Sequence, residues 1–152
     1  MNLINYDNIG GKSCLFINNI KFEDLLPFFL TESIVVERVY AYDDTSVYDE
    51  SFLKTVKDNK EFILKLNTPS IFLNSLTFIA GESRIEINDG YEYVIYSDEV
   101  MLRRIASTLL GCPQDLFTKL ENYQGKYILI VDCKVVSIFN DFDEFLQSGV
   151  DL

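Results

Sequence analysis

The sequence of 152 residues contains no histidine and no tryptophan, and it has only three prolines. Without histidine, the Ser-His-Asp and Cys-His arrangements of hydrolases cannot form within this chain. The usual zinc sites are excluded too, apart from a set made of cysteine and carboxylate ligands. We therefore expect a protein that is not an enzyme and that has no catalytic residue, no cofactor and no bound metal.

Basic residues are scarce as well, with 13 Lys and Arg against 24 Asp and Glu, a net charge of −11 and a pI near 4.3. Such a chain is repelled by phosphate, so neither direct nucleic-acid binding nor membrane binding is expected. No stretch approaches the roughly 18 apolar residues of a membrane span. The N-terminal segment lacks the basic and then apolar pattern of a signal peptide. These features predict a cytoplasmic protein.

Cysteine is rare and scattered, at Cys14, Cys112 and Cys133, with no Cys-x-x-Cys pair. An odd number of widely spaced cysteines predicts free, reduced and partly buried thiols. Cys133 lies at a predicted turn. The sequence shows one basic neighbour, Lys134, that could lower the pKa of the Cys133 thiol. A catalytic role for Cys133 is therefore not favoured.

Apolar residues are plentiful, at 48% hydrophobic and 14% aromatic, which argues against disorder. The length suits one domain that buries its own core. No internal repeat or low-complexity linker divides the chain. We predict a single α+β domain over residues 1–152, with a mostly antiparallel sheet packed against several short helices.

Local patterns place the individual elements. Runs of β-branched and aromatic residues predict strands at Ser13–Asn18, Ser33–Tyr42, Phe62–Leu66 and from Leu76, after one helical turn at Ile71. Capping residues and apolar periodicity predict helices that begin at Asp24, Asp49, Ser97, Pro113 and Asn140 or Asp141. The helix from Asp49 is expected to end at Asp58, the one from Ser97 at Gly111, and the last one at Gly149.

Two β-hairpins are predicted, at about 84–96 and at 127–139, and the first allows two registers. A two-residue Asp89-Gly90 loop pairs Ile87 with Glu92. A three-residue loop pairs Ile87 with Tyr91 and gathers the apolar residues on one face, so burial favours it. In that register Glu86 and Glu92 lie opposite each other, which is mildly unfavourable unless a cation is near. The second hairpin is apolar on both faces, which predicts a central position or cover by helices.

Two partial motifs do not predict a site. Gly10-Gly11-Lys12-Ser13 copies the end of a phosphate-binding loop, but Tyr6 stands where the first glycine is needed, so a loop leading into a strand is expected. Asp141 to Glu144 resembles the start of a calcium loop without its glycine and closing glutamate, so helix capping is expected there.

The excess acid is concentrated in three segments, at turns or helix starts, with charges of −4, −5 and −4, and the rest of the chain is at +2. Tyrosines lie within or beside them. Carboxylates that steer and tyrosines that anchor suit a surface that binds a basic protein, although acids also collect at helix starts for dipole reasons. The candidate partner-binding residues are Asp43, Asp44, Tyr48, Asp49, Glu50, Glu86, Asp89, Glu92, Tyr96, Asp98, Glu99, Asp141, Asp143 and Glu144.

With these acidic segments and with Tyr91 and Tyr96, the sequence resembles the small acidic immunity proteins that bacteria make against secreted toxins, including those of contact-dependent growth inhibition. The resemblance implies a cytoplasmic inhibitor that fills the basic active-site cleft of a toxin, often a nuclease. Two alternatives stay open: an acidic nucleic-acid mimic that inhibits a DNA-binding enzyme, and a magnesium-dependent enzyme that uses carboxylates. Acids in rows at phosphate-like spacing would favour the first, and acids that converge in a pocket would favour the second.

Overall fold

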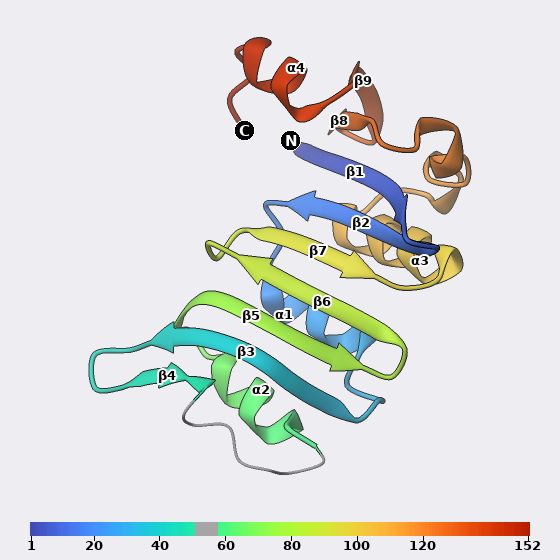
Figure 1. Cartoon of the computed structure of the whole chain (residues 1–152). Helices are drawn as coiled ribbons and strands as arrows, with labels where there is room; N and C mark the ends of the chain where they lie inside the picture. The colour runs from blue at the N-terminus through green and yellow to red at the C-terminus, as the bar shows by residue number, and fades with distance from the viewer. Residues whose placement is uncertain (51–57) are drawn as a thin grey trace. The chain divides into compact units, whose positions relative to one another are not determined.

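A computed structural model describes residues 1–50 and 58–152, and it is mixed α+β with antiparallel strand pairing, as predicted (Figure 1). The chain contains two compact units. The middle unit is Ile20–Tyr93, and the terminal unit consists of Met1–Asn19 and Val94–Leu152. The single domain expected from the chain length stays a prediction.

The middle unit has four paired strands in the order β4-β3-β5-β6, of which β3, β5 and β6 lie side by side in Figure 1. They are β3 (Ile34–Tyr42), β4 (Val47–Asp49), β5 (Phe72–Ala80) and β6 (Ser83–Asn88). Its helices are α1 (Phe22–Leu25), the short 3₁₀ helix η1 (Leu26–Phe28) and α2 (Lys60–Leu66). The core includes Phe29 and Phe78, whose rings meet edge-on at 6.1 Å between their centroids.

One edge of β3 is covered by the residues just before α2. The Val36 N–H donates to Asn59 Oδ1 at 2.8 Å, and the Ile34 N–H donates to Asp58 Oδ1 at 3.0 Å. The Asn59 N–H in turn donates to the Ile34 carbonyl. These bonds satisfy backbone groups that would otherwise form an open strand edge. The bond from the Ile34 N–H, followed by that from the Lys60 N–H, holds the pKa of Asp58 below its usual range.

The terminal unit has four antiparallel strands in the order β2-β1-β8-β9. They are β1 (Asn2–Ile9), β2 (Lys12–Asn18), β8 (Tyr127–Val131) and β9 (Lys134–Phe139). Its helices are α3 (Glu99–Leu110), the 3₁₀ helices η3 (Gln114–Leu116) and η4 (Leu120–Tyr123), and α4 (Phe142–Gln147). Leu3, Leu129, Phe139 and Phe145 form a buried cluster in which α4 packs on β9.

The strand β7 (Glu92–Tyr96) contains the boundary between the two units and follows a tight turn after β6. The Tyr91 N–H donates to the Asn88 carbonyl, and Asp89 and Gly90 both have positive φ. The turn thus closes as in the two-residue alternative. The buried residues nevertheless agree with the three-residue alternative, since Ile85, Ile87, Tyr93 and Ile95 are buried as it predicts. Tyr91, which it also places on the buried face, is exposed.

Several predicted elements are wrong. The segment Phe62–Leu66, predicted as a strand, lies in α2, and the helical turn predicted at Ile71 is replaced by β5, which is extended from Phe72. The first residues form β1, a strand that the sequence patterns did not predict. Asp24 lies inside α1 and is not its N-cap, and Asp98, not Ser97, caps α3.

Further differences concern the C-terminal half and the region after Asp49. Pro113 precedes a short 3₁₀ helix and not a longer α-helix. The strand β9 lies at the end of its strand order and exposes Val136, so the central position predicted for this hairpin is wrong. The alternative, cover by helices, holds in part, because α4 packs on Phe139 of β9. Asp49 ends β4, and most of the predicted helix 49–58 lies outside the described residues. The Gly10-Gly11 turn leads into β2, as expected.

The prediction of three free thiols is wrong. Cys112, which follows α3, forms a disulfide with Cys133 in the β8–β9 turn, with the two Cα atoms 5.4 Å apart. Cys14 lies outside this disulfide and is buried in β2. The pairing could not be inferred from spacing, because 21 residues separate the two cysteines and the tertiary structure brings the β8–β9 turn next to the end of α3, where Cys133 Sγ lies near the Gly111 carbonyl.

Within the described part of the chain, no helix combines the length and apolar character that crossing a membrane requires.

Candidate acidic and aromatic binding surface

A row of exposed rings lies across β3 and β5 in the middle unit. Tyr40 and Tyr42 alternate along β3 with the buried Val39 and Ala41, so their side chains point away from the core. The Tyr40 and Tyr42 centroids are 6.1 Å apart, and Tyr42 lies 5.1 Å from Phe72, its cross-strand partner on β5. Such contacts between neighbouring rings hold the side chains in place before any partner binds.

The turn between β6 and β7 lies beside the end of this row. The Gly90 N–H donates to the Asn74 carbonyl of β5 at 2.7 Å. A Cβ atom at Gly90 would lie 3.0 Å from the Leu73 carbonyl oxygen, so this close approach, with φ at +77°, requires glycine. Glycine thus allows the turn to place Asp89 and Tyr91 near Phe72.

Two of the three acidic segments therefore contribute residues that border the ring row of the middle unit. Asp44 follows Tyr42 in the β3–β4 loop, and Asp89 lies in the β6–β7 turn. Neither carboxylate has a hydrogen-bond or ion-pair partner among the described residues. We call this set the acidic–aromatic surface: Tyr40, Tyr42, Asp44, Phe72, Asp89 and Tyr91.

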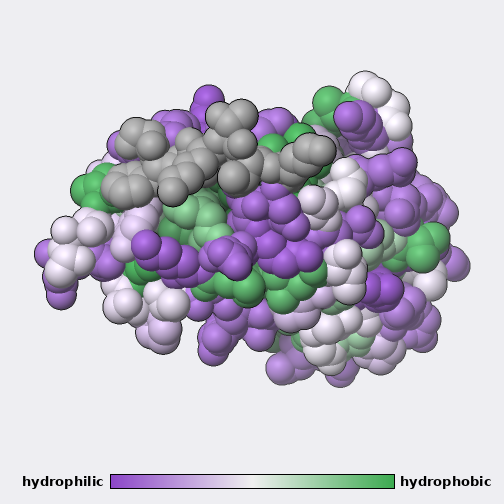
Figure 2. Space-filling model, turned by 90° about the horizontal axis from the view of Figure 1, so that it is seen from below, coloured by the Kyte–Doolittle hydropathy of each residue, from purple (hydrophilic) through white to green (hydrophobic). Residues whose placement is uncertain are grey.

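The rings of this surface are unusually accessible for large side chains, with exposed fractions of 45% for Tyr40, 41% for Tyr42, 51% for Phe72 and 53% for Tyr91. On the face of the molecule seen in Figure 2, hydrophobic residues are interspersed with hydrophilic ones and do not merge into one apolar area. Exposed aromatic rings beside free carboxylates are the composition that suits a protein-binding surface with charge preference.

Another predicted acid of the first segment, Asp43, stabilises the local structure of the β3–β4 loop. Asp43 Oδ1 accepts hydrogen bonds from the Thr45 and Ser46 N–H groups and from the Thr45 hydroxyl, and Oδ2 accepts from the Tyr48 hydroxyl. These bonds, those from Thr45 first, lower the pKa of Asp43. Tyr48 itself is buried under Lys65, whose Nζ lies 4.8 Å from the ring centroid. Asp49 is half-buried and Glu50 is exposed.

Glu86 has a cation within the same chain. Arg84 Nε donates to Glu86 at 3.2 Å, and Arg84 Nη1 donates to Glu37 of β3 at 2.5 Å. The two carboxylates raise the pKa of Arg84. Arg84 thus supplies a cation to Glu86, so this carboxylate does not depend on a partner for charge balance.

In the terminal unit, the predicted acids mostly cap helices. Asp98 accepts from the Met101 N–H at the start of α3, and Asp141 accepts from the Glu144 N–H at the start of α4, each at 2.8 Å. The Glu144 carboxylate accepts from the Asn140 N–H, and Asp143 lies in the first turn of α4. Capping explains these acids without a partner.

Glu99 differs from the capping acids because it lies next to another carboxyl group. A hydrogen bond with Glu121 raises the pKa of Glu99 and lowers that of Glu121, so the two groups share a proton more readily than isolated carboxylates do. Arg103 is 3.5 Å from Glu99 on the same helix. Tyr96 and Glu92 in β7 are half-buried.

Sequence reasoning missed Tyr40 and Phe72 as surface residues. The alternation of β3 could have indicated Tyr40, because its neighbours Val39 and Ala41 belong to the buried face. Phe72 could not be found in this way, since its segment had been assigned to a helical turn.

The described residues include no group of three or more His, Cys, Asp or Glu side chains that could hold a metal ion. Comparison with protein-family models, with curated proteins and with solved structures found no match for this chain.

Proposed function

We propose that this chain is an inhibitor that binds a basic bacterial toxin and neutralises it, in the manner of an immunity protein, through the acidic–aromatic surface. The observation that supports this proposal is the row of exposed rings Tyr40, Tyr42 and Phe72, which is bordered by residues of two acidic segments that are distant in sequence. The middle unit alone has a net charge of −7. That field attracts a basic partner, and the rings supply apolar contact area once it has docked.

The way in which the acids are used favours this proposal over a nucleic-acid mimic. A mimic needs rows of free carboxylates at phosphate-like spacing, whereas Asp43, Asp98 and Asp141 are occupied by backbone N–H groups and Glu86 by Arg84. The exposed rings add a feature that a phosphate mimic does not require.

The test is to mix the purified chain with the toxin domain encoded immediately upstream of its gene and to measure binding kinetics. We expect a complex whose association rate falls about tenfold from low to high salt, because long-range steering is screened. Phe72→Ala should raise Kd on the order of 30-fold, as loss of a central aromatic contact of about 2 kcal/mol does. Val100→Ala, at a more exposed apolar position in the terminal unit, is the control and should leave Kd unchanged.

Absence of a complex with that toxin domain would overturn the proposed function. If the Phe72→Ala variant instead binds the toxin domain as tightly as the unaltered chain does, the interface lies elsewhere.

The proposal sets the encounter in the cytoplasm, where thiols are kept reduced. Binding must then survive reduction of the Cys112–Cys133 bond. It should do so, because the disulfide belongs to the terminal unit and the acidic–aromatic surface belongs to the middle unit.

A further inference from the structure

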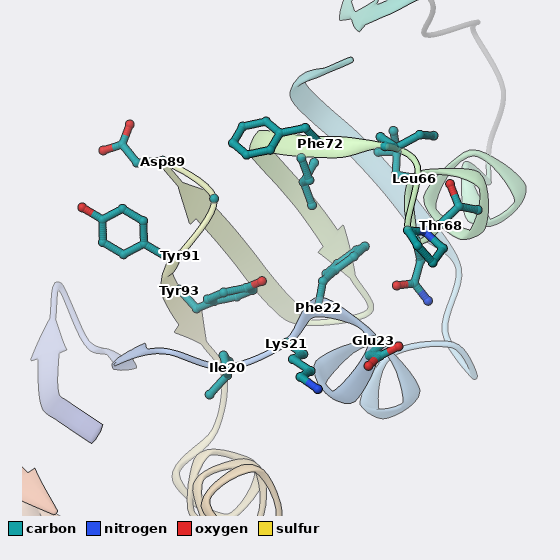
Figure 3. A pocket seen from close by; sticks show the side chains of 15 residues that line it. Ile20, Lys21, Phe22, Glu23, Leu66, Thr68, Phe72, Asp89, Tyr91 and Tyr93 are labelled. Carbon is teal, nitrogen blue, oxygen red and sulfur yellow. The ribbon is translucent and has the colours of Figure 1, made fainter. Parts of the chain in front are cut away.

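A groove of about 710 Å³ lies within the middle unit, next to the acidic–aromatic surface. It is bounded by the start of α1, by the end of α2 with the turn after it, by the first residues of β5, and by the β6–β7 turn. Figure 3 shows Phe22, Phe72 and Tyr93 around an open space, with Asp89 and Tyr91 on one side and Lys21 and Glu23 on another. Phe72, Asp89 and Tyr91 belong both to this groove and to the acidic–aromatic surface.

The groove is large enough to accept more than one side chain, since binding pockets for small molecules span roughly 300–1,000 Å³. Its wall is mostly apolar, with Phe22 half-buried and Leu66 and Tyr93 buried in the core beneath. An apolar side chain that enters the groove loses its contact with water and gains contact with rings, which is how the central residues of tight interfaces contribute most of the binding energy.

One polar group points into this apolar space. Figure 3 shows the hydroxyl end of Tyr93 directed toward Phe22 and the interior of the groove. Burial raises the pKa of Tyr93 to about 12, so the hydroxyl stays protonated at neutral pH and can donate a hydrogen bond. A backbone carbonyl of a bound segment is a suitable acceptor at this position.

The charges on the rim select the sign of what enters. Lys21 and Glu23 are both exposed on one side and offset each other in formal charge. Asp89 on the other side has no partner among the described residues, and the exposed ring of Tyr91 lies two residues away. A carboxylate beside an aromatic ring attracts an ammonium or guanidinium group and repels an anion.

We propose that this groove is the anchor site for the basic partner, and that it takes a large apolar side chain whose neighbour in the partner's chain is a lysine or arginine. The apolar side chain lies between Phe22, Phe72 and Tyr93, and the cation pairs with Asp89 across the Tyr91 ring. This inference rests on the proposed function, because it identifies which part of the same partner is recognised. It adds a site next to the surface, with a stated chemistry, that the ring row alone does not predict.

Filling the groove tests the inference directly. Thr68 is exposed on the groove wall, and its hydroxyl donates to the Lys65 carbonyl three residues earlier. Thr118 in the terminal unit is exposed as well and makes the same kind of bond to the Asp115 carbonyl. Thr68→Trp should therefore block the groove and raise Kd for the upstream toxin domain at least tenfold, and the matched Thr118→Trp variant should leave Kd unchanged. Equal melting temperatures would show that both variants fold.

The outcomes separate this inference from the proposed function. If the toxin domain binds and Thr68→Trp binds it as tightly as the unaltered chain, the groove is not the anchor site, although the proposed function stands. If the toxin domain does not bind at all, the proposed function fails. A peptide probe then tests whether the groove is a binding site.

That probe is the blocked tripeptide Phe-Arg-Phe, with Phe-Glu-Phe as its charge-reversed control, titrated into the labelled protein and followed by amide chemical shifts. We expect Phe-Arg-Phe to shift the signals of Gly90 and Tyr91 saturably, Phe-Glu-Phe to leave them unmoved, and Asp89→Asn to weaken the first titration severalfold. Equal shifts with both peptides would overturn the charge selection, and no shift with either would overturn the groove as a binding site.

Discussion

The two units of this protein use the same residue type for different purposes. In the terminal unit, aspartates at helix starts accept backbone N–H groups, as Asp98 and Asp141 do. In the middle unit, Asp44 and Asp89 have no such partner among the described residues and stand beside exposed rings. An acidic segment in a sequence is thus informative about binding only after the carboxylates that cap helices and close turns have been set aside.

The terminal unit also differs in how it is held together, since it contains the disulfide between Cys112 and Cys133. Replacing both cysteines with serine should lower the free energy of unfolding by about 3 kcal/mol, because the unfolded chain gains the freedom of an open loop of this length. Urea unfolding with and without reductant measures the effect. The double variant should bind the toxin domain as the unaltered chain does. A loss of affinity would break the separation of roles between the units.

A smaller effect sharpens the comparison of the two kinds of acid. Asp141→Ala removes an N-cap and should cost about 1 kcal/mol of stability while affinity stays unchanged. Asp44→Ala removes a carboxylate without a local partner, so stability should stay within about 0.5 kcal/mol and the association rate with the toxin domain should fall. Thermal unfolding of the two variants measures the change in stability, and binding kinetics on the same variants measure the change in affinity and association rate. The reverse pattern would place the interface on the terminal unit.

Much of the fold could be predicted because its strands have strong local patterns. The β-branched run in β3 and the two apolar hairpins were found within one or two residues of their observed bounds. The errors occur where tertiary contacts decide. The five residues Phe62–Leu66 fit a strand or a helix equally well, and the bonds of Asp58 and Asn59 to the β3 edge fix where α2 begins.

The strand β1 was missed for a related reason. Its asparagines look unsuited to a strand, but β1 pairs with β2 on one side and β8 on the other, and the buried Asn18 side chain accepts from the Leu3 N–H. Pairing on both edges outweighs a weak intrinsic preference. Of the candidate site, the acidic segments were visible in the sequence, whereas the placement of the β3–β4 loop and the β6–β7 turn on either side of the Tyr42–Phe72 contact required the order β3-β5-β6.

The smallest expected effect concerns Tyr93, a buried residue that lines the groove. Because burial raises the pKa of Tyr93 to about 12, above the usual value of 10.0, the folded state keeps the proton more tightly than the unfolded state. This contribution to stability is complete below pH 10 and is lost as the pH rises toward 12. The urea midpoint should therefore fall more between pH 9 and pH 11 for the unaltered chain than for Tyr93→Phe, which has no phenol to ionise.

Removal of the hydroxyl in Tyr93→Phe should leave stability at pH 9 nearly unchanged. It should weaken Phe-Arg-Phe binding, because the groove loses the donor that Figure 3 shows directed into it. Equal midpoint shifts for both chains would mean that Tyr93 ionises as freely as in water, and the groove would then be more open than its apolar wall indicates.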